Sequence, residues 1–353
     1  MKIALLTDTH FGARNDSVLF HEYFMKFYNN VFFPELEKRN IDTVIHLGDV
    51  FDRRKYINYN ILDRIKSDLF SQLKEKNINT HIIVGNHDTY YKNTNKVNSV
   101  KLLLGSYDNI TIYEEAEVAE FDGREILMVP WINQENEEYT LELIKNTSAL
   151  VAMGHLELSG FLMNPGMVNE HGLSMKVFDK FDKVYSGHFH HKSTNGNVTY
   201  LGNEYEITWI DYGDKRGFHI FDTETAEIEF IENPFTMFHK IFYDDIDKEL
   251  PQLLDEIKEE VIKERYVKVI VESKTNPYFF DKFMDKIYKS NPADISIVED
   301  IIIDDETVDD DVNLSEDTMT LLGRYVDELE IEADKNILKG VLKQLYMESL
   351  EVE

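Results

Sequence analysis

The sequence predicts an α/β (α+β) protein in which mixed β-sheets are covered by helices, and three observations support this class. The first is a series of short apolar runs that end in Gly or Asp, which is typical of buried strands. These runs lie at residues 3–6, 44–47, 81–84, 149–153 and 184–185. The second observation is a set of helical patterns between strands, at residues 18–39, 58–76 and 137–146.

The third observation is a group of strands that follow one another directly. Residues 110–113, 118–121 and 126–129 have strand character, and Asp122-Gly123 is typical of a hairpin turn. Residues 198–231 again favour strands, after a turn at Asn195-Gly196. Hairpins beside alternating strands and helices predict mixed sheets rather than one purely parallel sheet.

Composition indicates a soluble globular protein. The 353 residues allow two or three domains with a substantial core, and the hydrophobic content of 42% is ordinary. The absence of cysteine excludes disulfides and thiolate metal sites, and it fits a reducing compartment. No apolar run reaches the ~20 residues of a transmembrane helix, and no signal peptide is recognisable, so we expect a cytoplasmic protein without membrane contact.

Charge is distributed unevenly along the chain. The net charge of −30 argues against tight DNA binding by this chain alone. However, residues 51–100 contain nine Lys/Arg and five Asp/Glu, a local charge of +4. Residues 301–353 contain four Lys/Arg and sixteen Asp/Glu, or −12. The acidic residues are therefore concentrated away from the predicted strands at residues 44–47 and 81–84. The charge distribution thus remains compatible with an anionic substrate.

We expect the chain to divide into four parts. Residues 1–235 form the large α/β part, and residues 236–303 read as a small β-α-β-α-β unit whose second helix begins at Pro277. Residues 304–317 are too acidic to form a core and predict a solvated linker. Residues 318–353 predict two amphipathic helices, which either pack on the preceding domain or bind helices of a partner.

Polar motifs follow five of the predicted strands. They are Asp8-Thr9-His10, Gly48–Asp52, Gly85–Asp88, Gly154-His155 and Gly187–His190. Open α/β sheets place their sites just beyond the carboxyl ends of the strands, so we expect these motifs to meet. Mixed Asp, Asn and His donors suit Mn²⁺, Fe²⁺ or Zn²⁺ better than Mg²⁺ or Ca²⁺. The series predicts a two-metal phosphoesterase site, in which metals ~3.5–4 Å apart activate water and clamp the reacting oxygens.

Individual roles within the motifs follow from side-chain chemistry. A carboxylate has two oxygens, so Asp49 is our candidate bridge between two metals. His87 directly follows Asn86, and neighbouring side chains of an extended segment diverge, so we expect Asn86 to bind metal and His87 to face the substrate. His87 then protonates the leaving oxygen or stabilises the phosphate. We expect Asp88 to orient the His87 imidazole.

Basic and aromatic residues lie next to these motifs. Arg53, Arg54 and Lys55 are either ordinary solvated surface or contacts to phosphate. Tyr90 and Tyr91 are either packed side chains, which we favour, or platforms for bases beside the site. Seven histidines outside the motifs are interpreted as structural or surface residues: His21, His46, His81, His171, His191, His219 and His239.

The order D-x-H, GDxxD, GNHD, GH and GHxH over residues 8–190 resembles the calcineurin-like metallophosphoesterase superfamily. More narrowly, the chain resembles the SbcD-type nucleases, phage members included, that partner an SMC-like ATPase. The resemblance implies a four-layer αββα sandwich, a small capping domain at residues 236–303 and C-terminal helices that bind the ATPase. It also implies a homodimer formed through helices near residues 56–76.

The resemblance further implies a ligand set and an activity. One metal takes Asp8, His10, Asp49 and His190; the other takes Asp49, Asn86, His155 and His188. Manganese is the usual metal of the family, and His87 corresponds to its catalytic histidine. The implied activities are exonucleolytic cleavage of duplex DNA ends and endonucleolytic cleavage of single strands, in recombination, repair and phage recombination-dependent replication.

Two other functions remain open at this stage. Asp49–Arg53 is similar to the protein-phosphatase form GDxxDRG, so a protein phosphatase or a cyclic-nucleotide phosphodiesterase is the main alternative. Arg54 and Asp88, however, stand where that pattern has Gly and Glu. A non-catalytic scaffold is the second alternative, but every expected ligand is present.

Overall fold

The computed structural model describes residues 1–164 and 167–299, together with the single positions 326, 335 and 339. The predicted acidic linker at residues 304–317 and the predicted helices at 318–353 therefore lie outside the described residues, apart from those three positions. Within the described part, no helix is long and apolar enough to cross a membrane.

The first sheet has six strands in the order β14-β13-β1-β2-β3-β4. Its strands are β1 (Lys2–Leu6), β2 (Thr43–His46), β3 (Asn79–Ile83), β4 (Ile110–Tyr113), β13 (Gly217–Asp222) and β14 (Ile228–Glu232). Strands β1 to β4 are parallel to one another, whereas β13 pairs antiparallel with both β1 and β14. The parallel strands bring the ends of β1, β2 and β3 to one edge of the sheet.

The second sheet also has six strands, in the order β11-β12-β10-β7-β6-β5. Its strands are β5 (Glu117–Phe121), β6 (Arg124–Val129), β7 (Val151–His155), β10 (Lys183–Gly187), β11 (Ser193–Asn195) and β12 (Val198–Tyr200). Strands β6, β7, β10 and β12 run parallel, and β5 and β11 pair antiparallel as hairpin partners. The prediction of mixed sheets is thereby confirmed, including the hairpin at Asp122-Gly123.

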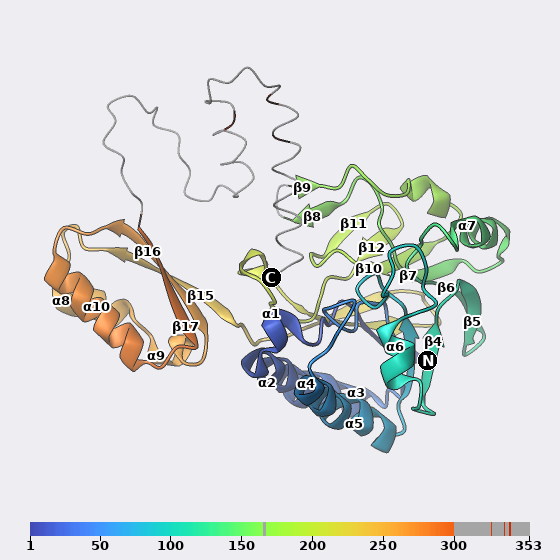
Figure 1. Cartoon of the computed structure of the whole chain (residues 1–353), viewed down its shortest axis with the longest axis horizontal. Helices are drawn as coiled ribbons and strands as arrows, with labels where there is room; N and C mark the ends of the chain where they lie inside the picture. Colours follow the sequence, from blue (N-terminus) through green and yellow to red (C-terminus); the bar gives the residue numbers. More distant parts are fainter. Residues whose placement is uncertain (165–166, 300–325, 327–334, 336–338, 340–353) are drawn as a thin grey trace. The chain divides into compact units, whose positions relative to one another are not determined.

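Both sheets are buried on two faces, which produces four layers. In β1, Ile3 and Leu5 belong to the core between the sheets, whereas Ala4 and Leu6 belong to the core beneath the first set of helices. Strand side chains alternate between faces, so a strand that is apolar throughout must be covered on both sides. A third core lies on the outer face of the second sheet. The two six-stranded sheets and the helices that cover them thus form an αββα sandwich (Figure 1).

Helices over the first sheet follow the predicted segments. The helices of this layer are α1 (Ala13–Asp16), α2 (Val18–Phe27), η1 (Tyr28–Phe32), α3 (Phe33–Arg39), α4 (Tyr59–Ile65), η2 (Lys66–Phe70), α5 (Ser71–Glu75) and α6 (Ser99–Leu104). Ser17 caps α2 by accepting a hydrogen bond from the Phe20 amide. The predicted helix at 18–39 is continuous through a π-helical turn, η1, and the helix at 58–76 contains a similar turn, η2.

Four of the remaining elements cover the second sheet or connect its strands: α7 (Glu137–Asn146), β8 (Leu162–Asn164), β9 (Met167–Val168) and η3 (Met175–Phe178). The fifth, η4 (Trp209–Asp211), connects β12 to β13 of the first sheet, and Trp209 packs against the core of that sheet's helical layer. Helix α7 matches its predicted bounds and contributes Ile144 to the core on the outer face of the second sheet. Helices on the outer face of each sheet thus hold in place the strands whose ends carry the candidate site.

Residues 238–299 form the predicted β-α-β-α-β unit. Its elements are β15 (Phe238–Asp244), α8 (Leu250–Glu256), α9 (Glu259–Ile262), β16 (Tyr266–Ser273), α10 (Pro277–Lys289) and β17 (Asp294–Glu299). The first helix of the predicted unit is in fact two short helices, α8 and α9. These elements share a hydrophobic cluster of their own, although residues Met1–Val298 group as one compact unit. The domain boundary at about residue 235 stays a prediction.

Candidate metal centre

The five motifs meet at the carboxyl edges of both sheets. Motif residues leave the ends of β1, β2 and β3 in the first sheet and of β7 and β10 in the second. The Asp8 amide donates to the Gly48 carbonyl at 3.0 Å, which joins the first two motifs. Across the sandwich, the His188 amide donates to both carboxylate oxygens of Asp8 at 3.0 Å. A hydrogen-bonded contact between two predicted ligands, Asp8 and His188, therefore connects the end of β1 in the first sheet to the end of β10 in the second.

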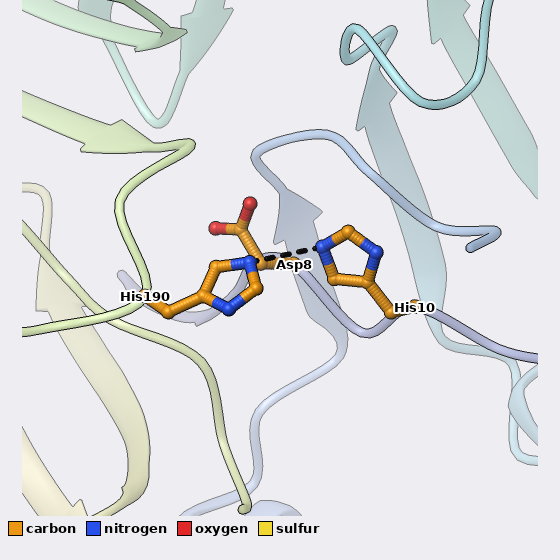
Figure 2. A group of neighbouring side chains, drawn as sticks. All are labelled: Asp8, His10 and His190. Atoms are coloured by element: carbon orange, nitrogen blue, oxygen red, sulfur yellow. Dashed lines mark hydrogen bonds between the residues drawn. The ribbon is translucent and has the colours of Figure 1, made fainter. Parts of the chain in front are cut away.

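The first donor group consists of Asp8, His10 and His190 (Figure 2). One ligand atom from each lies within 4.8 Å of the others. The Nε2 atoms of His10 and His190 are 3.1 Å apart. Thr7 donates a 2.6 Å hydrogen bond to Asp8 Oδ2, and this bond orients the carboxylate toward the group.

The second donor group consists of Asp49, His155 and His188, whose ligand atoms also lie within 4.8 Å of one another. Asn86 completes it: Asn86 Oδ1 is 2.8 Å from His155 Nε2 and 3.0 Å from His188 Nδ1. The Nδ1 atom of His155 is 2.8 Å from the Leu47 carbonyl, so Nδ1–H donates a hydrogen bond to that oxygen. The Nε2 atom of His155 is consequently directed into the group.

Asp49 lies between the two groups. Its Oδ2 atom is 3.3 Å from His155 Nε2 in the second group and 3.8 Å from His10 Nε2 in the first. Its other oxygen, Oδ1, accepts a 2.7 Å hydrogen bond from the His87 amide. This carboxylate faces both donor groups, the position that a bridging ligand requires.

The donor atoms are spaced as ligands of common ions. Metal bonds to nitrogen or oxygen of about 2.1 Å place adjacent ligands of an octahedral ion about 3 Å apart. The spacings of 2.8, 3.0 and 3.1 Å in the two groups match this value. His10 and His190 also approach nitrogen to nitrogen, a contact that stays repulsive unless a proton or a cation lies between them. The residues present therefore fit two divalent metals.

Glycines make these close approaches possible. A Cβ atom added at Gly48 would lie 2.5 Å from His155 Nδ1. One added at Gly85 would come closer than 3.0 Å to both the carboxylate and the amide of Asp49, and one at Gly187 would meet Asp8 Oδ2 at 2.9 Å. Each of these three motifs thus begins with Gly because residues of other motifs occupy the space that a Cβ atom would need.

Four of the seven predicted ligands have left-handed backbone conformations. The φ angles are 50° at Asp8, 42° at His10, 57° at Asp49 and 89° at His188. Such conformations cost free energy in residues other than glycine and persist only where the surroundings impose them. Their concentration at one place marks it as a functional site.

Burial and charge shift the pKa values of the ligands in opposite directions. Burial opposes the charged form of His10 and His155, but adjacent carboxylates outweigh it and raise both pKa values to about 9. Burial lowers the pKa of His188 to about 3 and that of His190 below its usual range. Burial alone would raise the pKa of Asp49, but the neighbouring imidazoles hold it well below its usual range. The negative charge of the buried carboxylates, which raises the pKa of His10 and His155, is the charge that bound cations would balance.

His87 lies beside the first donor group, but Asp88 does not orient it. The rings of His87 and His10 are 4.9 Å apart in an edge-on arrangement. His87 Nδ1 is 2.7 Å from the carbonyl oxygen of Asp52, which accepts a hydrogen bond from Nδ1–H and leaves Nε2 free to face a substrate. The prediction that Asp88 orients His87 is therefore wrong in this respect, because a backbone carbonyl performs that task.

Asp88 instead organises the backbone around the bridge. Its fully buried carboxylate accepts hydrogen bonds from four amides. The donors are the amides of Asp49 (2.9 Å), Val50 (3.0 Å), Phe51 (3.2 Å) and Gly85 (3.0 Å). The carboxylate thereby ties the second motif to the third and fixes the position of Asp49.

The predicted basic and aromatic contacts differ in their exposure. Arg53 is ion-paired with Asp16 at 2.9 Å, and the Nη1 atom of Arg54 is buried. Lys55 is exposed and lies 5.7 Å from the ring centre of Tyr90. Tyr90 and Tyr91 are exposed and pack edge-on against each other at 4.7 Å. The tyrosines are thus not core residues, contrary to the interpretation favoured from sequence.

Sequence reasoning missed three residues at this site. The Asp52 carbonyl orients His87, and the Asp52 carboxylate lies 3.4 Å from His10 Nδ1. Trp131 lies beside the second donor group, after the end of β6, so its position at a strand end was an available signal. The buried guanidinium of Arg216 donates to the carbonyl of His190, and no local sequence pattern indicated that contact.

The fold and the two donor groups define a metallophosphoesterase. Residues 1–192 match the calcineurin-like phosphoesterase family, and the chain belongs to that family. Over its whole length the chain is similar to exonuclease subunit 1 of Enterobacteria phage T4, with 33% identity over 353 residues and 99% of each chain covered. The family predicted from the motifs is thereby confirmed.

Similarity to solved structures is lower. An archaeal phosphodiesterase is similar over 66% of this chain and 100% of its own, with 16% identity and a TM-score of 0.32. The nuclease MPE of Pseudomonas putida is similar over 64% of this chain and 87% of its own, with 15% identity and a TM-score of 0.32.

Proposed function

We propose that this chain is the DNA nuclease subunit of an ATPase–nuclease complex and hydrolyses phosphodiester bonds with two divalent metals. The observation that carries the proposal is the position of Asp49 between two complete donor groups, with His87 beside them. The similarity to a phage exonuclease subunit supports DNA as the substrate.

In this proposal one metal is held by Asp8, His10, Asp49 and His190. The other is held by Asp49, Asn86, His155 and His188. When bound, two such ions lower the pKa of coordinated water and neutralise charge on the phosphate. The Asn and His ligands favour manganese, our proposed metal, over magnesium or calcium.

The residues of the chain supply orientation and proton transfer. The Asp52 carbonyl fixes the tautomer of His87 and turns Nε2 toward the substrate space beside His10. From there His87 donates a proton to the leaving oxygen or a hydrogen bond to the phosphate. Asp88 contributes indirectly, because it holds the backbone that presents Asp49.

The surface beside the site supports contact with DNA. Exposed Lys55 and the exposed pair Tyr90 and Tyr91 provide a cation and aromatic faces next to the third motif. Arg53 is held by its ion pair with Asp16, and part of the Arg54 guanidinium is buried. We therefore propose that these two arginines contribute less to DNA binding than Lys55 does. Duplex ends and single strands are the proposed substrates.

Partner binding is proposed for two segments. Residues 318–353 bind an SMC-like ATPase, in keeping with the predicted amphipathic helices of that segment. Two copies of the chain associate through the helices near residues 56–76, where Tyr56 and Tyr59 are exposed by 67% and 86%. The complex acts in recombination and repair of DNA in the cytoplasm of the infected cell, given the phage origin of its relative.

A nuclease assay on purified protein with added Mn²⁺ tests the proposal. Linear duplex and single-stranded DNA are the substrates, and Asp49→Ala is the control variant. We expect cleavage by the wild type and none by the variant. Cleavage that persists in the variant contradicts the proposed bridge. Hydrolysis of phosphopeptides or cyclic AMP without nuclease activity, with or without the ATPase, favours the phosphatase or phosphodiesterase alternative.

A further inference from the structure

Trp131 is placed at the edge of the second donor group without being one of its ligands. Its ring centre is 5.3 Å from that of His188 and 6.2 Å from that of His155. The indole is therefore an aromatic wall beside the space in which the second group would hold a metal and its phosphate.

The backbone of Trp131 is fixed from both sides. Its amide donates to the Val84 carbonyl at 2.8 Å, which links the end of β6 to the end of β3. Its carbonyl accepts hydrogen bonds from the side-chain amides of Asn95 at 2.9 Å and Asn136 at 3.0 Å. A rigid backbone lowers the entropy that a side chain loses when it binds a ligand.

Core packing does not account for this arrangement. Trp131 is only partly buried and belongs to none of the hydrophobic clusters among the described residues. Trp209 provides the contrast, because it packs against the cluster beneath the first sheet and lies 4.6 Å from the ring of Phe238. Both tryptophans of the chain are partly buried, but Trp209 packs against a hydrophobic core whereas Trp131 lies at the rim of the site.

We propose that Trp131 stacks on a nucleobase of the bound strand, next to the phosphate that is cleaved. This inference rests on the proposed DNA nuclease function and specifies how that site binds its substrate. A base offers its face to an indole only when it is unstacked from one neighbour, so the residue selects single strands or frayed ends. Any of the four bases satisfies this contact, because each has an aromatic face.

The test compares a substrate that has bases with one that lacks them. The substrates are an oligothymidylate and an abasic oligomer of equal length that carries tetrahydrofuran in place of each nucleoside. We expect Trp131→Leu to lower kcat/KM on the oligothymidylate by about tenfold or more, the range of base–aromatic stacking. On the abasic oligomer the same variant should stay within about twofold of the wild type. Trp209→Phe is the matched control and should leave both rates unchanged.

An equal loss on both substrates, or no loss on either, overturns the proposal while leaving the nuclease function intact. A second readout does not depend on cleavage. In Trp209→Phe protein with chelator present, Trp131 is the single tryptophan, and oligothymidylate should quench its fluorescence whereas the abasic oligomer should not. If the wild type cleaves neither substrate, with or without the ATPase, the nuclease proposal fails, and this titration alone decides the stacking proposal. Absence of quenching, or equal quenching by both oligomers, overturns it.

Discussion

Substitution of Asp88 separates the role that the structure gives this residue from the role predicted from sequence. Its carboxylate oxygen Oδ2 accepts from the amides of Asp49 and Gly85, and Oδ1 accepts from those of Val50 and Phe51. In Asp88→Asn one oxygen is replaced by an amide group that cannot accept a hydrogen bond. Two buried N–H groups then lose their acceptor, whichever way the side chain is turned.

The expected loss of stability follows from that count. Each unsatisfied buried N–H costs about 1–3 kcal/mol, so Asp88→Asn should lower the free energy of unfolding by about 2 kcal/mol or more. The loss is a large part of the ~5–15 kcal/mol of a typical protein. In either orientation at least one amide of residues 49–51 loses its acceptor, so the backbone that presents Asp49 is less well fixed and metal affinity should fall as well.

Urea denaturation with chelator present measures this loss without any contribution from bound metal. His87→Ala is the matched control: the side-chain contact of His87 is to the Asp52 carbonyl, and we expect little change in the urea midpoint. An Asp88→Asn protein with the wild-type midpoint and intact metal binding, but with the catalytic defect of the His87 variant, would refute the structural role and restore the orienting role.

Three further substitutions test other parts of the structure. Gly85→Ala should reduce the metal bound at equilibrium, measured by elemental analysis after dialysis, because its Cβ collides with Asp49. Arg216→Met should lower the free energy of unfolding by about 3–5 kcal/mol in urea, because it removes the partner of buried Asp211, 2.9 Å away. Burial raises the pKa of Glu204 above its usual value near 4.5. The folded protein then holds a proton that the unfolded chain releases, so stability falls as pH rises above about 4.5, by on the order of 1 kcal/mol per unit. Glu204→Gln should flatten that slope in urea titrations from pH 4.5 to 7.

Matched controls exist for the first two substitutions. Gly123→Ala adds a Cβ in open space at a φ of 79°, so it should cost stability without changing metal content. Lys215→Met removes an exposed ion pair to Glu232 and should change stability by less than about 1 kcal/mol. Equal metal loss in both glycine variants, or equal destabilisation in Lys215→Met and Arg216→Met, would contradict the reasoning.

The sequence predicted the ligand-bearing motifs because each follows an apolar strand, and strand ends in open α/β sheets converge. That rule needs only local patterns, and it applied to Asp8, Asp49, Asn86 and the later histidines alike. The rule could not predict the tautomer of His87, because the hydrogen-bond acceptor of Nδ1–H is the backbone carbonyl of Asp52, 35 positions away in the chain. Trp131 also follows the end of a strand, but an indole is not a metal ligand, so its type did not predict a place in a metal centre.

Buried polar contacts were equally inaccessible to local patterns. Asp88 accepts from amides up to 39 positions away, and Arg216 donates to the carbonyl of His190, 26 positions earlier. Side-chain type alone does not reveal which backbone groups a loop turns inward. Such contacts depend on the completed loops, whereas the burial of β1 on both faces can be predicted from its four apolar residues, 3–6.

The donation of ligands by two different sheets has a consequence for the nascent chain. His10 and His190 lie 180 positions apart, and each donor group includes residues from both halves of residues 1–190. At about 5–20 residues per second, translation needs roughly 10–40 s to reach His190. Until then a ribosome-bound chain carries Asp8, His10 and Asn86 without their partners. The candidate metal centre is thus incomplete in the nascent chain and forms only with the completed sandwich, which bound metal would then stabilise by mass action.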